Sequence, residues 1–468
     1  MGDSTYTEAG TEAGAGGAAG SALRLTRHWE EQAAGLLRQV FRGVPGSFIV
    51  RLWSGTAFRV GAAAGEPFAA AAAEPRFVLV FRNPRVISTM VLGRDPLRLA
   101  EAYFAGDVDI EGDFFAALSL KDHLEVMQAP LRERLGAWLS ALKLRAADAP
   151  AAHAFGDPAP SHGRKVTAHS RIENRDAIQF HYDVSNEFYR LWLDQAMVYS
   201  CGYFERVDES IDAAQQGKLE HICRKLMLRP GEKLLDIGCG WGALIVHAAR
   251  RHGVRAHGIT LSEKQLGVAR QRIAEAGLQD RVTVELKDYR DLDATAEYDK
   301  VSSIGMFEHV GLKNLPLYFS TVHRLLKPAG LFLNHGITHD QAGWQDNVWT
   351  RFINRYVFPD GQLDTISNIQ GVMEGERFEI ADVEALRSHY ALTLRHWVAR
   401  LEQRHVRALE YVSEATYRVW RLYMAACALE FESGHLGIYQ VLASKRGAAA
   451  ALPLTRRHLY REPAAVND

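Results

Sequence analysis

The hydrophobic positions of residues 175–446 fall into short apolar runs that alternate with segments of helical periodicity. Short apolar runs between turn signals indicate strands, and longer segments with apolar residues three or four apart indicate helices. We expect strands at 233–237, 254–259, 282–286, 300–304 and 330–334, and helices at 243–251, 262–276 and 317–326. This alternation predicts an α/β fold with a doubly wound, mostly parallel sheet.

A different pattern precedes this region. Residues 48–53 and 77–81 are apolar runs that predict strands, and Asn83-Pro84 is a chain breaker after the second run. Asp95-Pro96 has the form of an N-cap followed by proline at the first helical position, so it predicts the start of a helix. We therefore expect a smaller N-terminal α+β domain over residues 23–145.

Three further segments are expected to lie outside these two domains. Residues 1–22 are mainly Gly, Ala, Ser, Thr and Glu, which predicts a disordered tail, and residues 447–468 form a C-terminal tail. Residues 146–172 contain prolines and alanines without sustained periodicity, so they predict a linker to a domain over 173–446. A basic stretch of this linker is either a solvated hinge or a contact with anionic lipid headgroups. Its residues are His162, Arg164, Lys165 and His169.

Composition narrows the class of protein. The chain has 468 residues and a formal net charge of −1, whereas a nucleic-acid-binding surface usually brings a strong basic excess. No apolar run is long enough to span a bilayer, so we expect any membrane contact to be peripheral. The N-terminal sequence lacks a signal-peptide pattern, and the four cysteines lack metal-site spacing. These features predict a cytoplasmic protein with reduced thiols and no metal ion.

A glycine-rich turn, DIGCGWG at 236–242, joins the first expected strand to the first expected helix. Glycines let the backbone approach a ligand, and the N–H groups at a helix start bind carboxylates. The turn lacks the G-x-G-x-x-G spacing of dinucleotide sites. With its leading Asp, it resembles the S-adenosylmethionine motif of class I methyltransferases. The cofactor contacts expected here are Asp236, Gly238, Gly240 and Gly242.

Polar residues after the next two strands extend the expected cofactor site. Thr260 and Gln265 follow the second strand, where most such methyltransferases have an acidic residue for the ribose hydroxyls. Asp288 follows the third strand and is expected to accept a hydrogen bond from the adenine amino group, with Tyr289 beside it. The alternative for Asp288 is a helix cap.

Further strings occur in a fixed order around this turn. They are FHYDVSNEFY at 180–189, YSCGYF at 199–204, MFEHVG at 306–311, HGI at 335–337, YVFPDG at 356–361, HY at 389–390, LRHW at 394–397, CA at 427–428 and GIYQV at 437–441. As an ordered set they resemble the cyclopropane-fatty-acyl-phospholipid synthase family, which is related to the mycolic acid cyclopropane synthases. The resemblance is close over 174–446 and looser in the N-terminal domain, where it rests on EAYF at 101–104 and on Gly106.

The resemblance implies a reaction. Family members use S-adenosylmethionine to add a methylene unit to the cis double bond of an unsaturated phospholipid acyl chain. The alkene attacks the sulfonium methyl group, a carbocation forms on the chain, and a bound bicarbonate removes a proton so that the cyclopropane ring closes. The resemblance also implies a peripheral contact with the inner face of the membrane, through a lipid-associated N-terminal domain, and a possible homodimer.

The resemblance also implies which residues hold the bicarbonate. By motif match they are Cys201, Glu308, His335, the backbone at Ile337, and Tyr390, while Tyr199 and Ser200 flank the cofactor. Cys201 precedes the first expected strand, Glu308 follows the fourth and His335 follows the fifth, so the sheet should bring these three to one edge. Tyr, His and backbone N–H groups donate hydrogen bonds to a small anion, and a carboxylate accepts the anion's own proton.

A cysteine and several aromatic residues complete the candidate site. Cys427 matches the position designated as the active-site cysteine of the family. Methyl transfer to an alkene needs no covalent enzyme intermediate, and apolar neighbours indicate that Cys427 is a buried thiol. Ring faces stabilise cations in apolar cavities, and Phe204, Tyr356 and Phe358 are candidates for this role. Core packing is the alternative for each.

Other functions stay open. One is a synthase whose product is a methyl- or methylene-branched acyl chain. Another is a small-molecule N- or O-methyltransferase, since fold does not fix function. The expected anion site argues against it, because amine methylation needs no such site. A third is a lipid-binding module with an inactive methyltransferase domain, against which the intact glycine turn argues.

Overall fold

The computed structural model describes residues 29–41, 44, 47–60, 74–93, 96–120, 184–358, 361–448, 450 and 452–460. The chain divides into two compact units, Met1–Asp157 and Pro158–Asp468. The tail expected at 1–22, the linker expected at 146–172 and residues 461–468 lie outside the described residues.

The first unit contains a four-stranded sheet of order β2-β1-β3-β4. Strand β1 (Phe48–Arg51) pairs antiparallel with β2 (Ala57–Val60) and parallel with β3 (Phe77–Phe81), which pairs antiparallel with β4 (Val108–Gly112). A helix over residues 29–40 and helices α3 (Pro84–Gly93), α4 (Pro96–Ala105) and α5 (Phe114–Leu118) belong to the same unit. A single buried apolar cluster joins the sheet to these helices. The unit is therefore α+β, as expected.

The second unit is built on a seven-stranded sheet of order β10-β11-β9-β8-β5-β6-β7. Its strands are β5 (Lys233–Ile237), β6 (Arg255–Thr260), β7 (Val282–Leu286), β8 (Tyr298–Ile304), β9 (Leu326–His339), β10 (Phe378–Ala385) and β11 (Leu436–Lys445). Strands β5 to β9 are parallel, and β11 is antiparallel to both β9 and β10. The strand order reverses beside β5, which is where doubly wound sheets bind ligands. The predicted fold class is confirmed.

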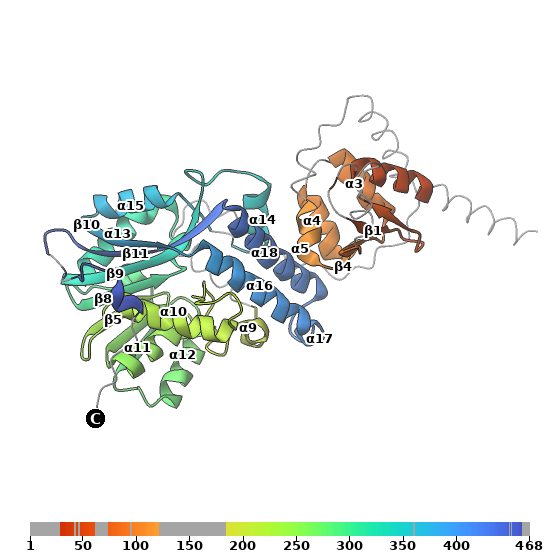
Figure 1. The fold of residues 1–468 in the computed structure, drawn as a ribbon. Helices are drawn as coiled ribbons and strands as arrows, with labels where there is room; N and C mark the ends of the chain where they lie inside the picture. The colour runs from red at the N-terminus through yellow and green to blue at the C-terminus, as the bar shows by residue number, and fades with distance from the viewer. Residues whose placement is uncertain are drawn as a thin grey trace, which may run out of the picture. The chain divides into compact units, whose positions relative to one another are not determined.

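Helices cover both faces of this sheet (Figure 1). Helices α10 (Ile211–Lys225), α11 (Ala243–His252) and α12 (Glu263–Glu275) share one buried apolar cluster with the sheet, and α13 (Leu315–Leu325) and α15 (Ile366–Gly375) share a second. The other helices are α9 (Asn186–Trp192), α14 (Val348–Tyr356), α16 (Arg387–Gln403), α17 (His405–Ala408), α18 (Glu414–Ser433) and α19 (Arg457–Tyr460). In the part of the chain that the structure describes, no helix has the length and apolar character needed to cross a bilayer.

The structure corrects two details of the expected elements. The fifth expected strand ends too early, because β9 continues to His339 and His335 therefore lies within the strand rather than after it. Pairing with β11 from Leu331 to His339 extends β9 beyond its apolar run. Pro84 follows a strand, but it is also the first residue of α3. Proline is tolerated there because the N–H at the first helical position has no hydrogen-bond partner within the helix.

A buried ion-pair network joins α10 to strand β10. Glu384 accepts a hydrogen bond from His221 Nε2 at 2.7 Å and lies 2.5 Å from Lys225 Nζ. Lys225 is fully buried. Burial raises the pKa of Glu384, but the hydrogen bond from His221 and the charge of Lys225 outweigh burial and lower that pKa to about 2.

We expect Glu384→Gln to reduce the free energy of unfolding at neutral pH. The folded-state pKa of Glu384 lies below its ordinary value of 4.5, so the ionised carboxylate stabilises the fold above that pH. This stabilisation is lost as the pH falls through about 2. The shift corresponds to roughly 3 kcal/mol. Denaturant unfolding of both chains between about pH 6 and pH 2.5 should show their difference shrinking in acid.

Glu432→Gln is the control for this comparison. It breaks an exposed ion pair with Arg395, which usually contributes about 1 kcal/mol or less. A difference between the parent and Glu384→Gln that stays constant over this pH range would contradict the role given to the buried carboxylate.

Candidate active site

The glycine-rich turn lies at the carboxyl end of β5, where the strand order reverses. Gly238, Gly240 and Gly242 have φ angles of 80°, 55° and 84°, which favour glycine. The N–H groups of Gly238 and Cys239 each donate to the Ile259 carbonyl oxygen at 3.0 Å, so the turn is fixed against β6. Helix α11 begins directly after the turn.

The three glycines make different contacts. A Cβ built at Gly240 would meet no atom within 4 Å, and Gly240 lines a cavity, so the missing side chain leaves space there. A Cβ at Gly238 would lie 3.0 Å from Met306 Cγ. Gly242 is not among the cavity residues: its Cβ would lie 3.1 Å from Ala269 Cβ, so it permits close packing of α11 against α12.

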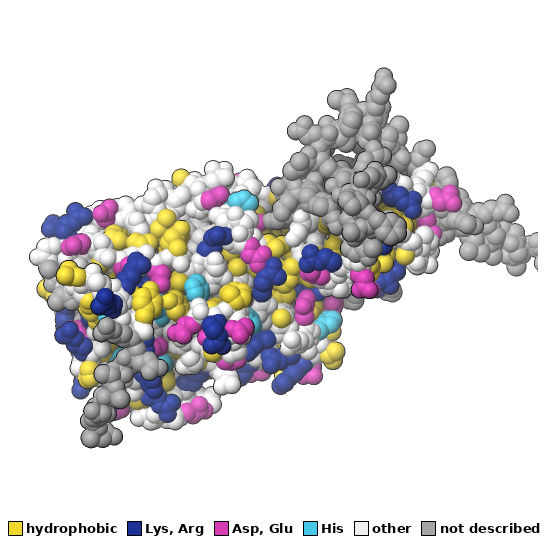
Figure 2. Space-filling view, viewed as in Figure 1, with side chains coloured by type: hydrophobic (Ala, Val, Ile, Leu, Met, Phe, Trp, Pro, Cys, Tyr) yellow, Lys and Arg dark blue, Asp and Glu magenta, His cyan; other side chains and the backbone are white. Residues whose placement is uncertain are grey.

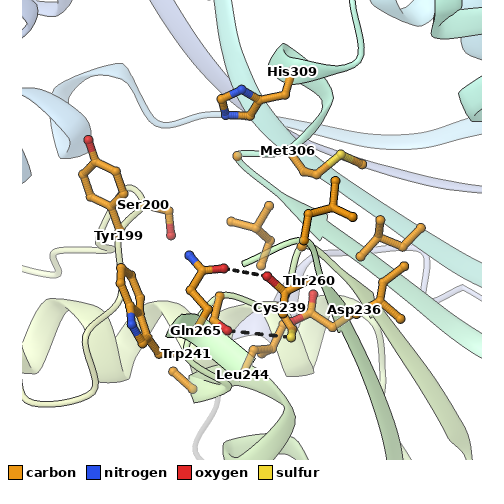
Figure 3. Close-up of a pocket in the computed structure, with 18 of the residues that line it drawn as sticks. Tyr199, Ser200, Asp236, Cys239, Trp241, Leu244, Thr260, Gln265, Met306 and His309 are labelled. Atoms are coloured by element: carbon orange, nitrogen blue, oxygen red, sulfur yellow. Dashed lines mark hydrogen bonds between the residues drawn. The ribbon is translucent and has the colours of Figure 1, made fainter. Parts of the chain in front are cut away.

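Apart from Gly242, this first cavity brings together every residue that the sequence predicts for the cofactor. Tyr199 and Ser200 lie across the cavity from Asp236 and Thr260 (Figure 3). The predicted residues that line it are Tyr199, Ser200, Asp236, Gly238, Gly240, Thr260, Gln265, Asp288 and Tyr289.

Gln265 is oriented by its neighbours. Thr260 Oγ1 donates to Gln265 Oε1 at 2.7 Å, and Ser262 caps helix α12 by accepting from the Gln265 backbone N–H. With its oxygen held, the Gln265 side chain turns its amide nitrogen toward the cavity (Figure 3). It offers a hydrogen-bond donor where related folds have an acidic acceptor.

Asp236 supplies a buried carboxylate at the end of β5. Its Oδ1 accepts a hydrogen bond from Ser302 Oγ on β8 at 2.7 Å. Burial raises the pKa of Asp236 to about 6, although that hydrogen bond and the charge of Lys218 act in the opposite direction. Asp236 is therefore mainly ionised at neutral pH.

Asp288 combines the two roles considered from the sequence. It lines the cavity, and it also caps the 3-10 helix Tyr289–Asp291 through the Arg290 N–H. Its carboxylate further accepts from Arg290 Nε at 2.8 Å and Nη2 at 2.6 Å. The helix-cap alternative is thus present together with the cavity position.

The segment just before Cys201 is held by hydrogen bonds with Asp194 and with Gln215. Asp194 accepts hydrogen bonds from the N–H groups of Val198 at 2.7 Å and Ala196 at 2.8 Å. From α10, Gln215 Nε2 donates to the Ser200 carbonyl oxygen at 2.8 Å. These bonds fix Tyr199 and Ser200 at the cavity wall.

A second cavity adjoins the first and contains every residue predicted for the reaction. Both cavities are lined by Tyr199, Ser200, Gly305 and His309. The predicted residues of the second cavity are Cys201, Glu308, His335, Ile337, Tyr390 and Cys427. The rest of its wall is largely apolar and aromatic, and includes Trp344, Trp349, Ile353, Phe358, Leu363, Leu394, Tyr423, Phe431, Leu436 and Ile438.

Glu308 and His335 each present one buried polar atom that has no hydrogen-bond partner among the described residues. Glu308 Oε1 accepts from the Ile337 N–H at 2.8 Å, while no residue that the structure describes bonds to its Oε2. His335 Nδ1 lies 3.1 Å from Gln440 Nε2, and its Nε2 likewise has no partner in the described part of the chain. With the Gln440 amide as donor, the neutral imidazole carries its proton on Nε2.

Burial favours the neutral forms of both Glu308 and His335. It raises the pKa of Glu308 and lowers the pKa of His335 well below its ordinary value. A neutral His335 Nε2–H is a donor, and Glu308 is a strong acceptor that also takes up a proton more readily than an exposed carboxylate. One of these atoms is therefore a donor and the other an acceptor, and both residues line the second cavity.

Gly336, between His335 and Ile337, makes this arrangement possible. A Cβ at Gly336 would lie 1.9 Å from Phe307 Cε1 and 3.0 Å from Glu308 Oε1. The 3-10 helix Phe307–His309 therefore packs directly on the backbone of β9. This contact places Glu308 next to the N–H that binds it.

The other predicted reaction residues lie around this pair. The Cys201 thiol donates to the Gly202 carbonyl oxygen at 3.2 Å, and burial raises its pKa, so the thiol is neutral. Tyr390 packs against Phe431 with ring centroids 4.8 Å apart. Cys427 lies on α18 and is 7% exposed, consistent with a buried thiol. The Ile337 N–H donates to Glu308 and so positions its carboxylate.

Only one of the three aromatic residues named from the sequence as cation-stabilising candidates lines the second cavity. Phe358 lines the second cavity, but Phe204 and Tyr356 do not. Phe204 instead stacks on His396 at 5.6 Å, and Tyr356 packs on Phe352 at 5.7 Å. Trp344 and Trp349 line the cavity without having been predicted, because they lie outside the quoted strings.

The family model described as mycolic acid cyclopropane synthetase matches residues 169–441. The chain belongs to this family. The match spans both cavities and the sheet of the second unit as far as Val441 in β11.

Two relatives and one solved structure show the range of the family. A probable fatty acid methyltransferase of Pseudomonas putida is 39% identical over 88% of this chain and 96% of its own length. The cyclopropane-fatty-acyl-phospholipid synthase of Escherichia coli is 38% identical over 59% of this chain and 69% of its own. The mycolic acid cyclopropane synthase CmaA1, complexed with SAH and CTAB, is 34% identical, with a TM-score of 0.55 over 58% of this chain and 98% of that chain.

Proposed function

We propose that the first cavity binds S-adenosylmethionine. The open space beside Gly240 lets a ligand approach the backbone of the turn. The Gln265 amide can donate a hydrogen bond to a ligand hydroxyl group, and the ionised Asp236 suits a ligand that carries an ammonium group. The SAH complex of the family member CmaA1 supports this choice. When bound, the cofactor supplies an electrophilic methyl group on a positively charged sulfur.

We propose that the second cavity holds a cis-unsaturated acyl chain of a phospholipid. The observation that carries this proposal is that an apolar, aromatic-lined cavity shares four wall residues with the cofactor cavity. Apolar walls bind a hydrocarbon chain by excluding water, and ring faces stabilise a cation in such a cavity by about 2 kcal/mol. The E. coli relative's name supports a phospholipid substrate.

We propose that bicarbonate occupies the space between Glu308 Oε2 and His335 Nε2. His335 would donate a hydrogen bond to one oxygen of the anion, and Glu308 would accept the hydrogen bond from its hydroxyl group. The bound anion would supply the base that removes a proton from the transferred methyl carbon, with the electron pair of that C–H bond closing the ring. Glu308, whose pKa is raised by burial, would then take up a proton from the protonated anion.

A methylene-branched product is a second candidate. The relatives named probable fatty acid methyltransferase match 88% and 78% of this chain, more than the 59% matched by the E. coli synthase. If hydride shifts from the methylated carbon to the cationic carbon before a methyl proton is lost, the product is a methylene branch on the chain instead of a ring. Both outcomes need a base, so Glu308 and His335 support both.

Label transfer tests the shared part of the proposal. The purified chain is incubated with S-adenosylmethionine labelled in its methyl group and with vesicles of monounsaturated or saturated phosphatidylethanolamine. We expect label only in the unsaturated lipid. Label on a small amine, or none with any lipid, would contradict the proposal.

We also propose a peripheral, partly electrostatic contact with the membrane. The basic residues of the C-terminal stretch are Lys445, Arg446, Arg456 and Arg457. Of these, Arg456 pairs with Asp382, and Arg446 lies 3.9 Å from Glu374. Positive and negative side chains are also mixed across the face shown in Figure 2. The proposal therefore rests more on the basic residues in the linker sequence, Arg164 and Lys165.

Binding to anionic vesicles is expected to fall as salt rises, because exposed charges are screened. The joint change Arg164→Ala and Lys165→Ala should weaken binding to anionic vesicles, measured by co-sedimentation, by up to roughly 30-fold at about 1 kcal/mol per charge. Arg456→Ala, whose charge is already paired, is the matched control and should change it less. Equal, salt-independent binding to neutral and anionic vesicles would contradict an electrostatic contact.

A further inference from the structure

Lys218 is a buried lysine in the wall of the cofactor cavity. It lies on α10, is 1% exposed, and lines the first cavity. Its Nζ donates a hydrogen bond to Ser200 Oγ at 2.8 Å. No sequence motif marks this residue, because it lies within an ordinary helical pattern.

The hydrogen bond determines what Ser200 offers to a ligand. An ammonium group has three donors and no acceptor, so Ser200 Oγ is the acceptor in this contact. The Ser200 hydroxyl proton is then directed toward another acceptor. Ser200 lines both cavities, so this acceptor can belong to a ligand.

The charge of Lys218 lacks a hydrogen-bonded anion. The neighbouring carboxylates are Asp194, which binds the N–H groups of Val198 and Ala196, and Asp236, which binds Ser302. Among the described residues, Ser200 Oγ is the hydrogen-bond partner of Lys218 Nζ. Burial lowers the pKa of Lys218 to about 8, against the charges of Asp194 and Asp236. A buried ammonium with one neutral partner is a site for an anion.

The proposed reaction also requires an anion beside Lys218. The cavity is proposed to hold a sulfonium, and a lysine charge in its wall would oppose that cation unless an anion compensates for it. The amino-acid end of the cofactor carries a carboxylate. We propose that Lys218 and Ser200 form the subsite for this carboxylate, with Lys218 both pairing its charge and orienting the Ser200 hydroxyl. The inference rests on the proposed function.

Calorimetry with two ligands tests the subsite. S-adenosylhomocysteine carries the carboxylate, and decarboxylated S-adenosylmethionine lacks it. We expect Lys218→Met to weaken binding of S-adenosylhomocysteine roughly 30-fold, as for a lost charged hydrogen bond, and to change binding of the decarboxylated ligand by less than about 3-fold. Ser200→Ala should weaken the first ligand selectively as well, and its effect should largely vanish in the Lys218→Met chain.

Lys225→Met is the matched control. Lys225 is also a fully buried lysine of α10, but it pairs with Glu384 and does not line the cavity. This change should lower the unfolding temperature without a selective effect on either ligand. If Lys218→Met fails to fold, Lys218→Gln and Ser200→Ala carry the same ligand comparison.

Three results would overturn the inference. One is an equal loss of affinity for both ligands, and another is additive effects of Lys218→Met and Ser200→Ala. The third is an unchanged affinity for S-adenosylhomocysteine with a raised bicarbonate requirement, which would assign the lysine to the bicarbonate anion instead. If the parent chain binds neither nucleoside ligand, the proposed function itself fails, and this outcome is distinct from the other three.

Discussion

Gly240→Val is expected to abolish binding of S-adenosylmethionine. Gly240 borders open space in the cofactor cavity, and a branched side chain would fill that space. Its φ of 55° adds backbone strain for a β-branched residue. Calorimetry should show no binding at concentrations that saturate the parent, and circular dichroism should show a folded chain.

Gly277→Val separates loss of the cavity from backbone strain. Gly277 has a φ of 65° and also has no atom within 4 Å of a built Cβ, but it lies outside the cavity. The control should lose stability while keeping its affinity for the cofactor. Unchanged affinity in a folded Gly240→Val chain would contradict the assignment of this cavity.

Glu308→Gln is expected to lower turnover by roughly 100-fold or more, the usual scale for a positioned proton transfer. The amide oxygen of glutamine still accepts from the Ile337 N–H, so the side chain keeps its place while the carboxylate is lost. Affinity for the cofactor should stay within a few-fold, because Glu308 lines the second cavity and not the first.

Bicarbonate provides the independent check on this variant. Its removal should slow the parent enzyme, and its addition should not fully restore Glu308→Gln, because the proton acceptor beside the anion is missing. Parental rates of lipid modification by Glu308→Gln would show that the anion site is assigned wrongly.

The fold could be predicted where local pattern and tertiary structure agree. Strand β5 matches its apolar run, because a central parallel strand is buried on both faces. Strand β7, at the edge of the sheet, matches because its two valines are buried and alternate with exposed residues. Strands β10 and β11 are missed. The sequence of β10, FEIADVEA, mixes charged and apolar residues, since it is an edge strand with one partner. Its pairing, and not its composition, makes it a strand.

The candidate site could be predicted where ordered strings mark it. Glu308 comes from the 3-10 helix that follows β8, His335 from β9 and Tyr390 from α16. The sheet and its covering helices place them around one cavity. Lys218 is missed because its role depends on burial beside Ser200, which no helical periodicity reveals. Phe204 and Tyr356 are selected wrongly because aromatic type alone does not say which way a ring points.

The structure of the lipid product tests the central claim most directly. Monounsaturated phosphatidylethanolamine treated with the chain and S-adenosylmethionine is analysed by mass spectrometry and by proton NMR. Proton loss from the transferred methyl group before any hydride shift predicts a gain of one CH2 per acyl chain, loss of the double bond and the high-field signals of a cyclopropane ring. A gain of one CH2 with a methylene branch on the chain, and no ring signals, would contradict ring formation and establish the branched-chain product instead.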